Sequence, residues 1–171
     1  MGIDAVELRL FEPDEWPMYK AVRLKALQSD PSVFGSNYGR EVVYTDADWR
    51  ERVENANQGI FGVFHYGDII GMTGVAVAKD DPSGTTAILW GSWLEKLWRG
   101  KGISEKMYQA RIGWALAHPA IKRINVAHRQ SNIASKQANQ KHGFVFTHLA
   151  HHTWPDGTDE PEVFYTLLLK R

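Results

Sequence analysis

The chain has 171 residues, no cysteine, and 20 basic against 20 acidic side chains, which gives a formal net charge of zero. The absence of thiols excludes disulfides, a zinc site with cysteine ligands and a cysteine nucleophile. The balanced charge gives no reason to expect nucleic acid or an anionic membrane as a partner. The length and an apolar content of 43% are typical of a single domain over residues 1–171 with a sizeable core.

Neither a secretory signal nor a membrane-spanning segment is predicted. Asp4, Glu7 and Arg9 interrupt the apolar residues of the amino terminus, whereas a secretory signal has an unbroken apolar region. No uninterrupted apolar run approaches the roughly 18 residues of a membrane span. We therefore expect a cytoplasmic protein that does not associate with a membrane.

The amino-terminal third is predicted to combine one strand with two helices. Alternating apolar residues predict a strand at residues 6–10. Apolar residues at helical spacing predict a helix over residues 14–29, with Asp14 as its N-cap. A second helix is predicted to follow Thr45 or Asp46, either of which can accept a hydrogen bond from the first turn.

Six further strands and two further helices are predicted in the rest of the chain. The strands are at residues 60–66, 69–78, 87–94, 124–126, 144–152 and 163–169, and the helices are at 105–117 and 132–142. The dipeptide Gly67-Asp68 predicts a tight hairpin between the first two of these strands. This order indicates an α+β, or mixed α/β, fold in which helices pack on a mixed sheet of about six to seven strands.

The loop that joins the third of these strands to the following helix carries two glycines, Gly100 and Gly102. Glycine lets the backbone approach an anion closely, and a helix start presents free N–H groups and a partial positive charge. Arg99 and Lys101 add cationic donors. The loop therefore predicts a site for a phosphorylated ligand. It fits neither a P-loop nor a dinucleotide-binding loop, whose third glycine would fall at Glu105.

Four segments resemble the GNAT superfamily of acyl-CoA-dependent N-acyltransferases. In chain order they are VFGS at 33–36, LWGSWL at 89–94, RGKGIS at 99–104, and Asn132 with Ser135, Asn139 and Gly143-Phe144. The third segment is similar to the pyrophosphate-binding loop of the family. The fourth keeps the family's spacing from an asparagine to a Gly-Phe pair. The order of the predicted elements also resembles the family over nearly the whole chain.

The resemblance implies a central mixed, mostly antiparallel sheet whose strands 4 and 5 run parallel and splay apart, flanked by about four helices. It also implies acetyl-CoA as the cosubstrate and no metal. The splayed strands are expected to admit the pantetheine arm beside a bulge near Trp93-Leu94. The residues expected to contact the cofactor are Trp93, Leu94, Arg99, Gly100, Lys101, Gly102, Ile103, Ser104, Asn132, Ser135 and Asn139.

The reaction implied by the resemblance is transfer of the acetyl group to a primary amine of a small molecule, by direct attack through a tetrahedral intermediate. The amine must be neutral to attack, so a base or a water chain removes a proton. His128 and Glu41 are the candidate catalytic residues, because an imidazole titrates near neutral pH and Glu41 is expected to border the acceptor site. The alternative role of His128 is that of a hydrogen-bonded histidine in the core or at the surface, and that of Glu41 is a solvated carboxylate.

Two positions depart from the family pattern. Ser104 replaces the last Gly or Ala of the loop, and Asn139 replaces a tyrosine that is commonly assigned as the acid for the departing thiolate. Asparagine can hydrogen-bond the sulfur but supplies no proton. Two other functions therefore stay open, an acyl-CoA-binding sensor or partner module with weak or no turnover, and a protein N-acetyltransferase. The family also commonly forms homodimers.

Overall fold

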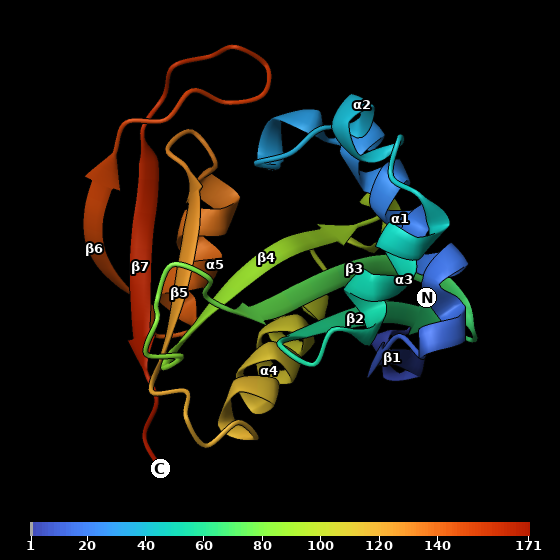
Figure 1. Cartoon of the computed structure of the whole chain (residues 1–171), viewed down its shortest axis with the longest axis horizontal. Coiled ribbons are helices and arrows are strands. Elements are labelled where there is room, and N and C mark those ends of the chain that lie inside the picture. Colours follow the sequence, from blue (N-terminus) through green and yellow to red (C-terminus); the bar gives the residue numbers. More distant parts are fainter. Residues whose placement is uncertain (1) are drawn as a thin grey trace.

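The computed structural model describes residues 2–171, and its centre is one seven-stranded sheet (Figure 1). The strands are β1 Val6–Leu10, β2 Gln58–His65, β3 Asp68–Val77, β4 Thr86–Leu94, β5 Arg123–Arg129, β6 Val145–Ala150 and β7 Glu162–Leu168. They are ordered β1-β2-β3-β4-β5-β7-β6 across the sheet. Among the described strands, only β4 and β5 pair in parallel, and all other neighbours are antiparallel. The predicted mixed, mostly antiparallel sheet is confirmed.

Four helices of nine or more residues and one short helical turn flank this sheet. They are α1 Trp16–Ser29, α2 Tyr38–Glu41, α3 Asp46–Glu54, α4 Ile103–Leu116 and α5 Ile133–Lys141. Thr45 caps α3 as predicted, since its hydroxyl accepts from the Asp48 backbone N–H at 3.2 Å. The predicted cap at Asp14 is wrong, because residues 13–15 form a separate 3-10 turn and α1 begins after it. None of the helices within residues 2–171 is long and apolar enough to cross a membrane.

Side-chain alternation along β2 separates the interior into layers on the two faces of the sheet. Ile60 packs with Tyr19 of α1 and Trp49 of α3. Its neighbour Phe61 points to the other face, where it packs with Tyr108 of α4. Successive residues of a strand face opposite sides of the sheet, so α1 and α3 cover one face and α4 covers the other.

The hairpin between β2 and β3 is present, but its turn is shifted by one residue from the predicted Gly67-Asp68. The two loop residues are Tyr66 and Gly67, which have φ angles of 48° and 86°. Two successive positive φ angles define the turn type that matches the twist of a two-residue hairpin. Asp68 instead begins β3 opposite His65.

The pairing of β4 with β5 is short, and it ends where the two strands diverge (Figure 1). Thr86, Ala87 and Ile88 pair with Arg123, Ile124 and Asn125, and the ladder stops there. From Leu89 to Leu94, the edge of β4 that faces β5 has no strand beside it among residues 2–171. The predicted splay of strands 4 and 5 is therefore confirmed.

A bulge in β4 lies at Gly91-Ser92, two residues before the predicted position at Trp93-Leu94. Trp90 pairs with Gly74 and Trp93 with Met72, so two residues of β4 oppose the single residue between them on β3. Gly91 has a φ of 67°. This left-handed conformation is one that glycine adopts at little cost, so the bulge forms at the glycine.

We predict that Gly91→Ala lowers the free energy of unfolding by about 1–2 kcal/mol, because a Cβ is disfavoured in the left-handed region. The new atom would also lie 3.3 Å from Met72 Cε. The control is Gly35→Ala, whose Cβ meets open space and whose φ is not positive. Urea titration of both variants checks this, and equal stabilities would contradict the assignment of strain to Gly91.

Candidate active site

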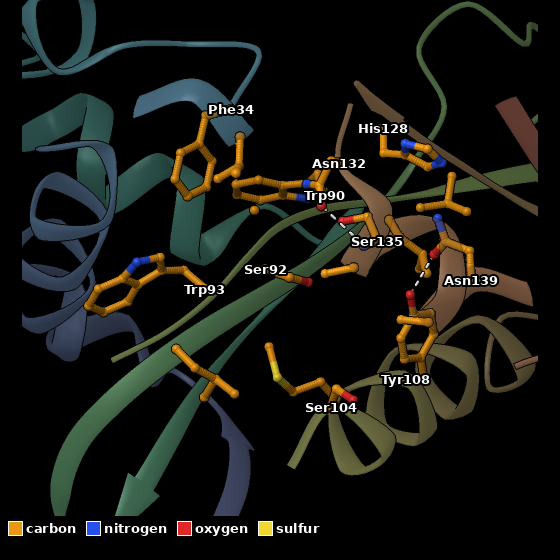
Figure 2. Close-up of a pocket in the computed structure, with 18 of the residues that line it drawn as sticks. Phe34, Trp90, Ser92, Trp93, Ser104, Tyr108, His128, Asn132, Ser135 and Asn139 are labelled. Atoms are coloured by element: carbon orange, nitrogen blue, oxygen red, sulfur yellow. Dashed lines mark hydrogen bonds between the residues drawn. The ribbon is translucent and has the colours of Figure 1, made fainter. Parts of the chain in front are cut away.

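Two adjoining cavities, each of about 420 Å³, lie where β4 and β5 diverge. The first is bounded by β4, β5, α4 and α5, and Figure 2 shows Ser92, Ser104, Tyr108 and Asn139 around it. The second lies toward the segment after α1 and the loop before β7. Both cavities are lined by Phe34, Trp90 and His128, among others. The two cavities therefore lie side by side where the strands diverge.

The glycine loop leads directly into α4 at one end of the first cavity. Gly100 and Gly102 have φ angles of 72° and 81°, so both positions use the conformational freedom of glycine. Within the described chain, no side chain caps the N-terminus of α4, and its first N–H groups point out of the helix. The Ile103 side chain is buried in the core and Lys101 is exposed. The loop can therefore meet an anion through its backbone and through Lys101.

Arg99, a predicted phosphate contact, already has an anionic partner inside the protein. Its Nη2 donates to Asp30 at 2.8 Å, and its Nε donates to the Leu94 carbonyl at 2.9 Å. Trp93 Nε1 donates to the same carboxylate at 2.7 Å. The Arg99 hydrogen bond lowers the pKa of Asp30, so this carboxylate is ionised at neutral pH. Arg99 thus ties the glycine loop to the ends of α1 and β4.

Asn132 and Ser135 lie together at the start of α5, on the opposite wall of the first cavity. The Asn132 side-chain oxygen accepts from the Ser135 backbone N–H at 3.1 Å, and it caps the helix in this way. The cap fixes the orientation of the Asn132 amide, whose Nδ2 remains a donor. Trp93, Leu94, Arg99, Ser104, Asn132, Ser135 and Asn139 line this cavity, whereas Gly100, Lys101, Gly102 and Ile103 do not.

Asn139 is buried, and its partner is a residue that sequence reasoning missed. Its Oδ1 accepts a hydrogen bond from the Tyr108 hydroxyl of α4 (Figure 2). Its Nδ2 is buried without a hydrogen-bond partner among the described residues. Arg111, also missed, lies one turn after Tyr108 and lines the same cavity. The sequence could have indicated this pair, because Tyr108 and Arg111 are three residues apart and therefore lie on one side of α4.

His128 lines both cavities, but the two nitrogens of its ring have partners. Nδ1 lies 2.6 Å from the Arg129 carbonyl, which can only accept, so Nδ1 carries a proton. Nε2 lies 3.0 Å from the Tyr165 hydroxyl. The ring is buried and stacks on Tyr165. This geometry matches a hydrogen-bonded core histidine, and it leaves Nε2 as the basic nitrogen.

Glu41 is not at the surface, and it lines neither cavity. Arg23 holds its carboxylate through two hydrogen bonds of 3.0 and 2.8 Å, and Arg52 adds a third of 2.8 Å. Burial raises the pKa of Glu41, but the hydrogen bonds and charge of Arg23, with Arg52, outweigh it and lower this pKa to about 2. A carboxylate held this way is a poor proton acceptor. The geometry therefore favours neither the catalytic nor the solvated role.

The loop before β7 covers the second cavity, where it contributes His152 and Trp154. Arg129 anchors this loop, since it pairs with Asp156 at 2.9 Å and also with Glu160. The same guanidinium donates to the carbonyl of Ser32 at 3.1 Å. One buried arginine therefore fastens the loop to the segment that follows α1, and together they form the outer wall of the second cavity.

The described residues contain no group of three or more side chains placed to hold a metal ion.

The chain matches the family model of the acetyltransferase (GNAT) domain over residues 6–145. It therefore belongs to the GNAT family of acetyltransferases, and this membership makes it an acyltransferase that depends on acetyl-CoA. No curated protein sequence matches the chain significantly.

Solved structures of low sequence identity share the fold. A GNAT-family acetyltransferase from Streptococcus pneumoniae superposes with a TM-score of 0.80 at 19% identity, over 96% of this chain and 99% of that one. The yncA protein of Salmonella typhimurium, described as a putative acetyltransferase with its cofactor acetyl-CoA, gives 0.78 at 15% identity over 97% and 95%. A Salmonella typhimurium acetyl transferase that modifies the N-terminal serine of ribosomal protein L7/L12 gives 0.74 at 17% over 97% and 96%.

We predict that Glu41→Gln destabilises the fold by about 3–5 kcal/mol at pH 7, because it leaves the buried Arg23 and the half-buried Arg52 without their anion. The Glu41 pKa falls from 4.5 to about 2 on folding, so its ionised form stabilises the native state above pH 4.5. This contribution is lost as the pH falls toward 2.

Urea titrations between pH 7 and pH 3 check this prediction. The gap in stability between wild type and Glu41→Gln should narrow below about pH 4.5. The control is Glu54→Gln, an exposed change on α3 that should cost under about 0.5 kcal/mol. A gap that stays constant over the whole range would contradict the ion-pair account.

Proposed function

We propose that this protein transfers an acetyl group from acetyl-CoA to the primary amine of a small molecule, by direct attack through a tetrahedral intermediate. The observation that carries the proposal is the pair of adjoining cavities at the divergence of β4 and β5. The first begins at an uncapped helix start suited to a pyrophosphate, and the second offers a separate chamber for an acceptor. The two substrates then meet beside Trp90 and His128.

In this proposal the cofactor lies along the first cavity. The backbone N–H groups of residues 100–104 and the Lys101 ammonium hold the pyrophosphate, and the small Ser104 allows its close approach. The free edge of β4 and the Asn132 Nδ2 hydrogen-bond the amides of the pantetheine arm. The thioester reaches the bulge at Gly91-Ser92, where an N–H of the unpaired edge faces the developing oxyanion. Arg99 acts indirectly, through its hold on the loop.

The acceptor occupies the second cavity, whose size suits a small molecule. The loop held by Arg129 borders this cavity through His152 and Trp154, which supports a compact acceptor over an internal segment of a folded protein. The amine must lose a proton before or during attack. His128 lines both cavities, and its Nε2 acts as the base through Tyr165 or water because the Tyr165 hydroxyl already occupies it.

The test measures release of the CoA thiol from acetyl-CoA in the presence of one acceptor at a time. The acceptors are small primary amines, peptides with a free N-terminus and peptides with an internal lysine. We expect turnover of a small amine well above the rate of acetyl-CoA hydrolysis. Turnover of peptides alone would favour a protein N-acetyltransferase. Tight binding of CoA without transfer to any amine would contradict the enzymatic proposal and favour a sensor.

We also predict that Gly102→Glu abolishes CoA binding in a calorimetric titration. The variant strains a backbone with a φ of 81° and places a carboxylate where the pyrophosphate would lie. Gly84→Glu is the matched control, because Gly84 has a φ of 67°, meets open space and lies in the loop between β3 and β4. The control should bind CoA like the wild type, and retained affinity in Gly102→Glu would refute this placement.

A further inference from the structure

Among the described residues, one phenol lines the first cavity, that of Tyr108 on α4, which lies outside the four segments that resemble the family. Tyr108 extends from α4 toward Asn139 of α5, and Figure 2 shows the two side chains meeting at the cavity wall. Asn139 stands where the family pattern has a tyrosine. A phenolic hydroxyl that is absent from α5 is thus present on α4, in direct contact with the substituted position.

Arg111 gives Tyr108 an unusual electrostatic environment. It is buried, and none of the carboxylates within residues 2–171 forms an ion pair with it. Its Nε donates to the Met107 carbonyl at 3.1 Å, and its guanidinium carbon lies 4.7 Å from the centre of the Tyr108 ring. Burial lowers its pKa to about 10, so it is still a cation at neutral pH. A buried cation without a paired anion lowers the stability of the fold. The position of Arg111 therefore points to an anion that forms beside it only during the reaction.

A titratable ring beside that of Tyr108 is uncharged at neutral pH. His142 stacks on it with ring centres 4.0 Å apart. Burial and the neighbouring Lys141 lower the pKa of His142. Burial raises the pKa of Tyr108 itself, against the opposing charge of Arg111, so the phenol keeps its proton in the resting protein. Arg111 is therefore the cation that a tyrosinate at position 108 would meet.

We propose that Tyr108 is the catalytic acid that gives its proton to the departing CoA thiolate, and that Arg111 and Asn139 position it. This inference rests on the proposed acetyl transfer and names the group that completes it.

The step balances in atoms and charge. The amine nitrogen forms its bond to the acetyl carbon, and the carbon–sulfur bond then breaks with its electron pair on sulfur. The Tyr108 hydroxyl proton moves to that sulfur, which leaves CoA as a thiol and Tyr108 as a phenolate beside Arg111. The proton lost by the amine nitrogen, carried by water, restores the phenol. No other reactant is consumed.

The other polar groups of the first cavity are less suited to this step. Asp30 is ionised and held by Arg99, so it has no proton to give. The Ser92 hydroxyl is paired with Thr73 at 2.7 Å, and an alcohol is a much weaker acid than a phenol. His128 is engaged by Arg129 and Tyr165 on both nitrogens. Tyr108 needs only a half-turn of the Asn139 amide, after which Nδ2 donates to the phenol oxygen and frees its proton.

The first measurement needs no acceptor amine. The pKa of the CoA thiol bound to the protein is obtained from thiolate absorbance against pH, with desulfo-CoA as the blank. A hydrogen bond from Tyr108 stabilises the thiolate, so the bound thiol should titrate below the value of about 8.5 for a free thiol. Tyr108→Phe should raise the pKa of the bound thiol by about one unit, and Arg111→Met should raise it by a smaller amount than Tyr108→Phe does. Tyr66→Phe, at an exposed turn, is the control and should change nothing.

The second measurement uses an amine that the wild type acetylates. Tyr108→Phe should lower kcat by about 100-fold, with KM for acetyl-CoA changed less than about twofold. Equal thiol pKa values in wild type and Tyr108→Phe would overturn the proposal, and so would an unchanged kcat. A shifted thiol pKa in a protein that acetylates no amine would support the contact between Tyr108 and sulfur while refuting the proposed function. Failure of the proposed role of Tyr108 and failure of the proposed acetyl transfer therefore give different results.

Discussion

The site depends on the early end of hydrogen bonding between β4 and β5, which pair only as far as Ile88 and Asn125. Each strand is held on its other side, β4 by β3 and β5 by β7, and β7 accompanies β5 over its whole length. The two halves of the sheet are therefore rigid on either side of the gap. A gap fixed in this way keeps backbone donors available for a ligand and cannot close by re-forming the ladder. The bulge at Gly91 aims the free part of β4 into the space.

Charge is arranged around this gap so that most of its arginines pair with carboxylates. Arg99 pairs with Asp30, Arg23 and Arg52 share Glu41, and Arg129 pairs with Asp156 and Glu160. These pairs link segments that the chain order separates, and they hold the helical and loop walls against the sheet. Arg111 departs from this arrangement, because its neighbour is the Tyr108 ring rather than a carboxylate. An unmatched positive charge beside a phenol suits a reaction that creates a negative charge there.

Local patterns in the sequence predicted the order of helices and strands along the chain and the glycine loop, because each rests on neighbouring residues. The splay of strands 4 and 5 came instead from the resemblance to the GNAT family. The resemblance placed the bulge two residues late, because it implies that β4 is interrupted, whereas the positive φ of Gly91 decides where. The partners of Glu41 and Asn139 were not predictable in this way. Arg23 lies 18 residues from Glu41 and Tyr108 lies 31 residues from Asn139, so only the packing of separate helices brings each pair together.

A crystal structure of the protein with bound CoA tests the central claim most directly. The account predicts that the pyrophosphate lies at the start of α4 over Gly100 and Gly102, and that the pantetheine arm passes between β4 and β5. It also predicts that the sulfur lies within hydrogen-bond distance of the Tyr108 hydroxyl. A cofactor bound outside the gap, or a sulfur that lies away from Tyr108 and next to a different acid, would contradict it.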